Sequence, residues 1–385
     1  MKRIRDVDRD ESENRFLSGF KTNVQSRKKK KINAVCKITQ TQLLQEFKIY
    51  NLYETFEIVE KINEGAYGKV YKAINKLDNN IYALKYNKNP ERIKELIMRE
   101  VKFLQKLDHK NIVKLYGIAY EGELDSNFYM IFEYMDYDLR TFAFKYEKSL
   151  TLSHIKNILK QILCGLDHLH RQKILHLDIK PANILINKKG EVKLADFGMS
   201  NLCMGGKYPK NSITQNYRPP ELFLTPNESI EYKYEVDIWS YGCVALELLL
   251  LKDRDRHANQ MMFYGSNDLD ILNCIFSVCG SPVKDKVWDD AFSINRNYVL
   301  KYENIPKKSQ IDHILGLFYK DCTKVTSFVQ DLLKIDPKQR KSANVMLYHE
   351  FFQADPDMST TDDIRNIILD VDLSESKELI SYDDI

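Results

Sequence analysis

The sequence lacks any apolar run long enough to cross a bilayer. Its longest apolar stretch, at 244–251, is far shorter than the roughly 20 residues that a transmembrane helix needs. The N-terminal region is charged and has no apolar core of signal-peptide length. We therefore expect no association with a membrane.

Cysteine is also sparse, and its placement excludes two kinds of site. The seven cysteines are scattered and odd in number, which does not favour a disulfide framework. Cys274 and Cys279 lie five apart, but no second pair or nearby histidine cluster would complete a zinc site. Reduced thiols indicate a nuclear or cytoplasmic protein, or one found in both places.

A strong charge imbalance is missing as well. The net charge of the 385 residues is only +3, so we expect no direct binding of nucleic acid from bulk electrostatics. Residues 1–52 form a basic tail, and the run Arg27–Lys31 fits either a nuclear localisation or nucleic-acid patch, or a solvated arm. Residues 353–385 form an acidic tail, which either docks through its Ile/Leu pairs or is disordered.

The most informative stretch is 176–198, which reads H-L-D-I-K-P-A-N-I-L-I-N-K-K-G-E-V-K-L-A-D-F-G. Two apolar strands, 184–186 and 192–195, flank a turn and predict a hairpin. The hairpin would bring Asp196 back beside Asp178 and Asn183. Carboxylate and amide oxygens suit Mg²⁺, and a carboxylate that binds no metal can accept a proton from an attacking hydroxyl.

The region before this stretch predicts a small sheet. Residues 56–62, 70–74 and 81–86 read as strands, and the glycines between the first two either approach a phosphate or form a plain hairpin turn. Lys85 lies on the third strand, where a lysine needs a partner or a ligand. A helix from Pro90 to about Leu107 follows, and Glu100 on its apolar side is the natural partner of Lys85.

Together these segments resemble eukaryotic serine/threonine protein kinases over residues 56–352. The resemblance implies an α+β, bilobal fold within a kinase domain at 53–352. A small β-rich N-lobe with one main helix would occupy 53–132, the hinge 133–137 and a larger α-helical C-lobe 138–352. It also implies ATP and Mg²⁺ as cofactors.

The same resemblance assigns the catalytic and metal-binding roles. Asp178 would be the catalytic base, and Lys180 would contact the transferring phosphate. Asn183 and Asp196 would bind Mg²⁺.

The resemblance places the nucleotide against three parts of the chain: a glycine loop, an ion pair and the hinge. The residues implied are Ile62, Asn63, Gly65, Gly68, Val70, Lys85, Glu100, Glu133, Met135 and Asp138. Two further implications are structural. Glu221 would pair with the distant Arg340, and Asp237 would brace the catalytic-loop backbone.

Three segments look most like cyclin-dependent kinases of the CMGC group: F-E-Y-M-D-Y-D-L at 132–139, Y-R-P-P-E-L at 217–222 and an insert at 263–288. Membership would imply a protein substrate with Ser or Thr followed by Pro, and Arg218 stands where the group places an arginine behind the proline pocket. It would also imply a cyclin-type activating subunit and a role in cell-cycle or transcription control.

Three departures bear on activity and its control. Asn63 replaces the first loop glycine, Leu177 replaces the usual arginine, and Pro209 stands at the usual phosphothreonine position. Because the phosphate and its receptor are both missing, we predict that activity does not need phosphorylation of the activation segment. Ser212 and Thr214 remain as possible sites.

Two rival functions deserve comparison. A pseudokinase scaffold would bind partners without transferring phosphate, and Asn63 and Leu177 give that alternative its footing. A small-molecule kinase fits poorly, because the peptide-kinase features around 217–221 and Asp237 are complete.

Overall fold

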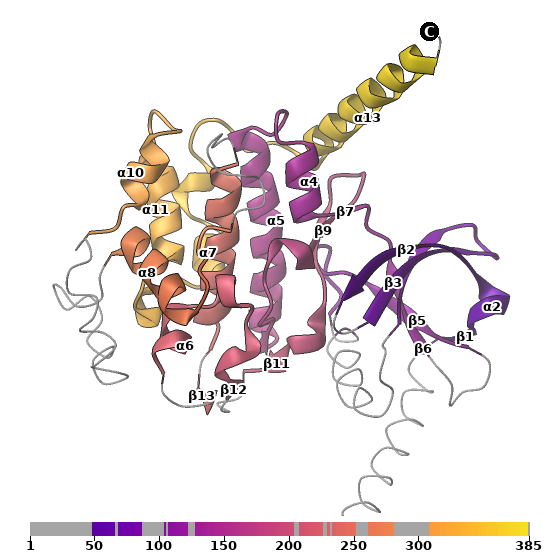
Figure 1. Ribbon diagram of the computed structural model, residues 1–385, viewed down its shortest axis with the longest axis horizontal. Coiled ribbons are helices and arrows are strands. Elements are labelled where there is room, and N and C mark those ends of the chain that lie inside the picture. The colour runs from indigo at the N-terminus through magenta and orange to yellow at the C-terminus, as the bar shows by residue number, and fades with distance from the viewer. Residues whose placement is uncertain are drawn as a thin grey trace, which may run out of the picture.

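The computed structural model describes residues 48–65, 68–86, 104, 107–121, 128–203, 208–225, 229–231, 233–251, 261–280 and 308–383. These residues form a β-rich lobe and a larger helical lobe (Figure 1), so the α+β, bilobal prediction is confirmed. Glu100, most of the helix predicted at 90–107, most of the basic tail and the end of the predicted insert lie outside the described residues.

The small lobe is built on one sheet with the strand order β1-β5-β6-β4-β3-β2. All neighbouring strands run antiparallel except β1 and β5, which are parallel. The predicted strand at 81–86 is confirmed at both ends. The elements are β1 (Ile49–Asn51), α2 (Leu52–Thr55), β2 (Phe56–Gly65), β3 (Gly68–Asn75), β4 (Ile81–Tyr86), β5 (Leu115–Tyr120) and β6 (Phe128–Glu133).

Strand β1 lies in a stretch that the sequence assigned to the basic tail. The N–H of Ile118 donates to the carbonyl of Lys48 at 3.1 Å, and Leu52 is fully buried. Gly117 permits this close approach, because a Cβ there would lie 2.4 Å from the Lys48 carbonyl oxygen. Residues 49–51 therefore belong to the sheet of the small lobe.

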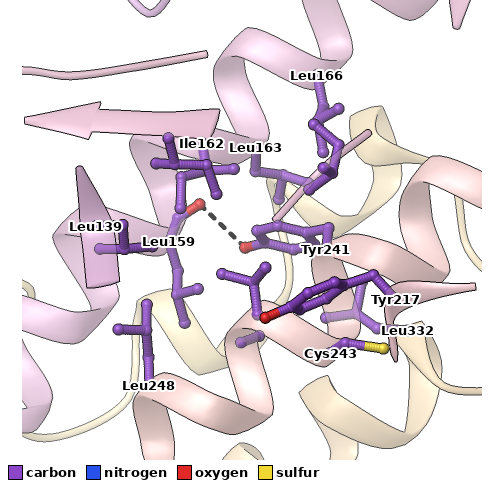
Figure 2. Packing of buried hydrophobic residues seen from close by; sticks show 14 of the residues in the cluster. Leu139, Leu159, Ile162, Leu163, Leu166, Tyr217, Tyr241, Cys243, Leu248 and Leu332 are labelled. Carbon is purple, nitrogen blue, oxygen red and sulfur yellow. Dashed lines mark hydrogen bonds between the residues drawn. The ribbon is translucent and has the colours of Figure 1, made fainter. Parts of the chain in front are cut away.

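The large lobe packs around α5 and α7. Their buried faces meet in one cluster, in which the Tyr241 hydroxyl donates to the Leu159 carbonyl at 3.0 Å (Figure 2). Helix α5 begins at Leu152, with Thr151 as its N-cap. The helices are α4 (Leu139–Lys145), α5 (Leu152–Arg171), α6 (Pro220–Leu224), α7 (Glu235–Leu249), α8 (Asp268–Cys279), α10 (Ile311–Gly316), α11 (Thr323–Leu332), α12 (Ala343–Met346) and α13 (Thr361–Asp383).

Short strands connect the lobes and frame the central stretch. The predicted hairpin is confirmed as β9 (Ile184–Ile186) and β10 (Val192–Leu194), in which Leu194 pairs with Ile184. Strand β7 (Tyr137–Asp138) joins its other edge. Two further pairs are β8 (Ile174–Leu175) with β11 (Asn201–Leu202), and β12 (Tyr208–Pro209) with β13 (Ser229–Ile230).

The segment after Phe352 docks on the large lobe through the first part of α13. Ile364 and Ile368 of α13 are fully buried. Before α13, one face of α5 donates hydrogen bonds to main-chain carbonyls of residues 347–359, through Ser153, Lys156, Asn157 and Lys160. Among the described residues, no helix combines the length and apolarity needed to span a membrane.

Candidate active site

The catalytic loop runs from His176 to Asn183 and is anchored by Asp237 of α7. The Asp237 carboxylate accepts the N–H groups of His176 and Leu177, both at 2.9 Å, and the His170 ring nitrogen at 3.1 Å. Burial alone would raise the pKa of Asp237, but these hydrogen bonds outweigh it and lower the pKa. The two backbone hydrogen bonds confirm the prediction that Asp237 braces this backbone.

Asp178 sits at the centre of a group of polar side chains. Its Oδ2 lies 2.8 Å from the Lys180 Nζ and accepts from the Asn183 Nδ2 at 2.7 Å. Its Oδ1 accepts from the Thr214 hydroxyl at 2.5 Å. Lys180 also donates to the Thr214 oxygen at 3.2 Å. The structure therefore brings together the three residues predicted on this loop.

Lys85 reaches across from the small lobe to Asp196, and their side chains form an ion pair of 2.8 Å. The Lys85 ammonium lowers the pKa of the Asp196 carboxyl, against the effect of burial. Asp196 has a left-handed backbone, with φ of 61°, at the turn that leaves β10. The described residues place Lys85 on Asp196, whereas Glu100 lies outside them.

The chemistry of Asn183 and Asp196 fits a hard cation. The Ala195 N–H donates to the Asn183 carbonyl at 2.9 Å, so the two predicted ligands stand at adjacent ends of the hairpin. Within the described ranges, no group of three or more His, Cys, Asp and Glu side chains could hold a metal. A site with one amide and one carboxylate suits Mg²⁺, which takes its remaining ligands from phosphates and water.

Strand β2 ends at Gly65 and β3 begins at Gly68, so these two glycines stand at the ends of the hairpin strands. Gly65 pairs with Gly68, Asn63 with Val70, and Val70 with Lys85 on β4. Asn63 is not among the described residues with positive φ, so it does not use the left-handed tolerance that its residue type offers. Instead it continues the strand beside a register shift. Ile62 is 42% exposed next to it.

The predicted hinge residues join β6 to β7. The Glu133 carboxylate accepts the Lys114 N–H at 2.6 Å and pairs with Lys193 at 2.9 Å, while Met135 is buried. The Asp138 carboxylate caps α4, accepting both the N–H and the hydroxyl of Thr141. Asp138 therefore fixes the start of α4, and its contact with the nucleotide stays a prediction.

Comparison with known families decides what this arrangement belongs to. The profile described as "Protein kinase domain" matches residues 56–352. The chain belongs to the protein kinase family. That match extends through both lobes of this kinase, from the start of β2 to Phe352, and includes every site residue described in this subsection.

Similarity to curated proteins shows that this kinase is cyclin-dependent kinase-like. A Dictyostelium discoideum protein named as a probable cyclin-dependent serine/threonine-protein kinase is 38% identical over 84% of this chain. The CTD kinase subunit alpha of Schizosaccharomyces pombe and the cyclin-dependent kinase C-1 of Arabidopsis thaliana are each 35% identical, over 78% and 79% of the chain. The chain spans 22%, 49% and 61% of these three relatives respectively.

Thr214 is a residue of the site whose role the sequence analysis missed. It was considered as a phosphorylation site, but its hydroxyl bridges Asp178 and Lys180. A threonine at 214 carries no local signal of this contact, because the partners lie 36 and 34 residues away. The hydroxyl marks where an acceptor hydroxyl could approach the Asp178 carboxylate.

Leu177 takes part in an apolar cluster instead of a charged one. Its backbone is left-handed, with φ of 67°, and its side chain is buried. The cluster contains Leu175, Leu177, Ile213, Leu222 and Val236. It joins the catalytic loop to the end of the activation segment by apolar contact, at the place where related kinases carry an arginine.

We expect the stability of this kinase to fall as the pH drops below about 6.5. Burial lowers the pKa of four histidines from 6.5: His109, His154, His176 and His349. Below pH 6.5 the unfolded chain therefore binds more protons than the folded one, so acid favours unfolding. Thermal unfolding at about pH 7.5, 6.5 and 5.5 should show a midpoint that is lower by at least a few degrees at pH 5.5. An unchanged unfolding midpoint would contradict this prediction.

Proposed function

We propose that this kinase transfers the γ-phosphoryl group of ATP, with Mg²⁺, to a Ser or Thr followed by Pro in a protein, and that a cyclin-type subunit activates it. The observation that carries the proposal is the Asp178 carboxylate in contact with Lys180 and Thr214. Lys85, Asn183 and Asp196 complete the set of catalytic groups that the resemblance implies among the described residues.

The chain's own residues supply positioning, charge and a proton acceptor. Asp178 would orient the acceptor hydroxyl and take its proton, and Asn183 holds that carboxylate through the hydrogen bond at 2.7 Å. Lys180 and Lys85 would neutralise phosphate charge from opposite sides of the cleft. Asn183 and Asp196 would hold Mg²⁺, which supplies charge neutralisation at the phosphates when bound. Positioning and electrostatics account for most of the catalysis in such transfers.

Arg218 supports the preference for proline. It is buried, and its Nε and Nη2 donate to the Ile213 carbonyl at 3.2 and 3.1 Å. Arg218 thus fixes the backbone just before Thr214, where the residue after the acceptor would lie in a substrate. The names of the relatives support a cyclin partner, and one of them names a CTD kinase. We place the kinase in cell-cycle or transcription control, in the nucleus, the cytoplasm or both.

One assay tests this function. The purified chain, alone and with candidate cyclins, is given ATP, Mg²⁺ and two peptides that differ only in Ser-Pro against Ser-Ala. We expect transfer to the Ser-Pro peptide, stimulated by a cyclin. Equal use of both peptides would overturn the proline preference. ATP binding without transfer in every combination would favour the second candidate, a pseudokinase scaffold, for which Asn63 and Leu177 are the supporting observations.

We predict that activity does not depend on phosphorylation of the activation segment. The apolar cluster around Leu177 holds Ile213 without a phosphate, and Pro209 at the usual phosphothreonine position has no hydroxyl. Phosphatase treatment and Ser212→Ala, which removes only a hydroxyl bonded to the Pro209 carbonyl, should each leave kcat within about twofold. Loss of activity in either case, together with phosphate found on Ser212 or Thr214, would contradict this prediction.

A further inference from the structure

Helix α13 packs against the elements that carry the hinge and the catalytic hairpin, and then continues beyond them (Figure 1). Its start touches the β9–β10 turn at Gly190, whose φ is +79°. A Cβ at Gly190 would lie 2.3 Å from the Thr361 carbonyl oxygen and 3.1 Å from the Ile364 Cβ. The turn between the two proposed metal ligands is therefore shaped to receive this helix.

Asp372 of α13 contacts three polar side chains of those elements. Its Oδ1 accepts from the Lys145 Nζ at 2.7 Å and from the Tyr146 hydroxyl at 3.1 Å. Its Oδ2 lies 3.4 Å from the Lys188 Nζ. Burial would raise the pKa of Asp372, but Lys145, Tyr146 and Lys188 together lower it. An ionised carboxylate thus joins α4, the turn after α4 and the β9–β10 turn.

Two separate connections lead from Asp372 to the hinge. Through the first, the Tyr146 hydroxyl, which donates to Asp372, accepts from the Tyr137 hydroxyl at 3.0 Å, and Tyr137 precedes Asp138 in β7. Through the second, Lys188 also donates its backbone N–H to the Asp136 carboxylate at 2.8 Å. Both connections end within residues 136–138, the stretch between Met135 and α4. The resemblance to kinases implies that Met135 and Asp138 contact the nucleotide.

We propose that Asp372 is a positioning residue for the nucleotide pocket. By holding Tyr146 and Lys188, it fixes residues 136–138 in the geometry that binds ATP, so α13 tunes nucleotide affinity without touching the nucleotide. This inference rests on the proposed function, since it assumes that the nucleotide binds at the hinge. It also makes α13 a place where a partner or a modification would change ATP affinity from outside the cleft.

The test measures the affinity of the full chain for mant-ADP, together with KM for ATP and kcat on a Ser-Pro peptide. Asp372→Asn removes the charge and is compared with Asp370→Asn, two residues earlier on the exposed side of α13. We expect Asp372→Asn to weaken mant-ADP binding and raise KM for ATP roughly 3- to 30-fold, with kcat within about twofold. Asp370→Asn should change neither, and Asp372→Glu, which keeps the charge, should restore part of the affinity.

A second variant separates positioning from a merely structural role. Tyr146→Phe keeps the ring and removes the hydroxyl that links Asp372 to Tyr137. It should weaken mant-ADP binding alone but add less than its own effect to Asp372→Asn, because both act on the same connection. Equal mant-ADP affinity of Asp372→Asn and Asp370→Asn would overturn the inference alone. Failure of the unmodified chain to bind mant-ADP would overturn the proposed function, and this inference with it.

Discussion

Replacing Asp178 by asparagine is expected to lower kcat by about 10²–10⁴-fold, the usual contribution of a general base, while leaving the site folded. The amide can keep its oxygen towards Lys180 and Asn183, where Asp178 now accepts two contacts at 2.8 and 2.7 Å. Its nitrogen then faces the Thr214 oxygen, which can turn its own hydrogen away. The variant loses the proton acceptor but can still form hydrogen bonds with the same three side chains.

The measurement is phosphate transfer to a Ser-Pro peptide, with mant-ADP affinity as a check on folding. Asp108→Asn is a matched control, because it removes a carboxylate from an exposed position. The control should retain full activity, and Asp178→Asn should bind mant-ADP normally. If the unmodified kinase transferred no faster than Asp178→Asn, the carboxylate would have no catalytic role and the scaffold function would be favoured.

Replacing Arg340 by alanine is expected to destabilise the large lobe by about 3–5 kcal/mol, because it strands a buried carboxylate. Arg340 is bidentate to Glu221, with both N–O distances at 2.7 Å, as the sequence predicted. Its remaining N–H groups donate to the carbonyls of Glu235, Ile335 and Lys334. The guanidinium also lies over the Trp239 ring, 4.8 Å from its centre.

Thermal unfolding measures this effect, and the midpoint should fall by roughly 10 °C or more. Lys341→Ala is the control: the neighbouring lysine forms an ion pair with Asp331 but is half exposed, and a surface pair contributes about 1 kcal/mol or less. Glu221→Gln combined with Arg340→Met should recover part of the loss, since it removes both buried charges. A fall no larger than that of Lys341→Ala would show that the pair is not stabilising.

The catalytic hairpin could be predicted from the sequence because its signals are local. An apolar triplet at 184–186 and the alternating Val-Lys-Leu at 192–194, on either side of a turn, fix β9 and β10, and the turn returns Asp196 to Asn183. Helix α7 also carries a local signal, because apolar residues surround it on nearly all sides, and nearly all of its side chains are buried. The contact between Lys180 and Asp178 was also predictable, because the two residues lie only two positions apart in the sequence.

Contacts between distant segments could not be predicted in this way. Nothing local to Thr214 shows that it reaches Asp178. The pairing of β1 with β5 depends on Gly117 leaving room for the Lys48 carbonyl, and a glycine in a strand indicates close approach without naming the partner. For α13 a local signal existed. Thr360 and Asp363 exchange capping hydrogen bonds, the arrangement that S/T-x-x-D before an apolar run predicts.

One face of α5 holds residues 354–359, which we call the strap, through hydrogen bonds to main-chain carbonyls. Lys156 donates to the Ala354 and Pro356 carbonyls, Asn157 to that of Ser359 and Ser153 to that of Asp357. A carbonyl is the same whichever residue bears it, so the specificity of this attachment is encoded in the helix and not in the strap. We therefore expect the strap to accept many sequences of the same length, whereas α5 accepts few changes at these positions, and a chimaera with a foreign strap should still dock α13.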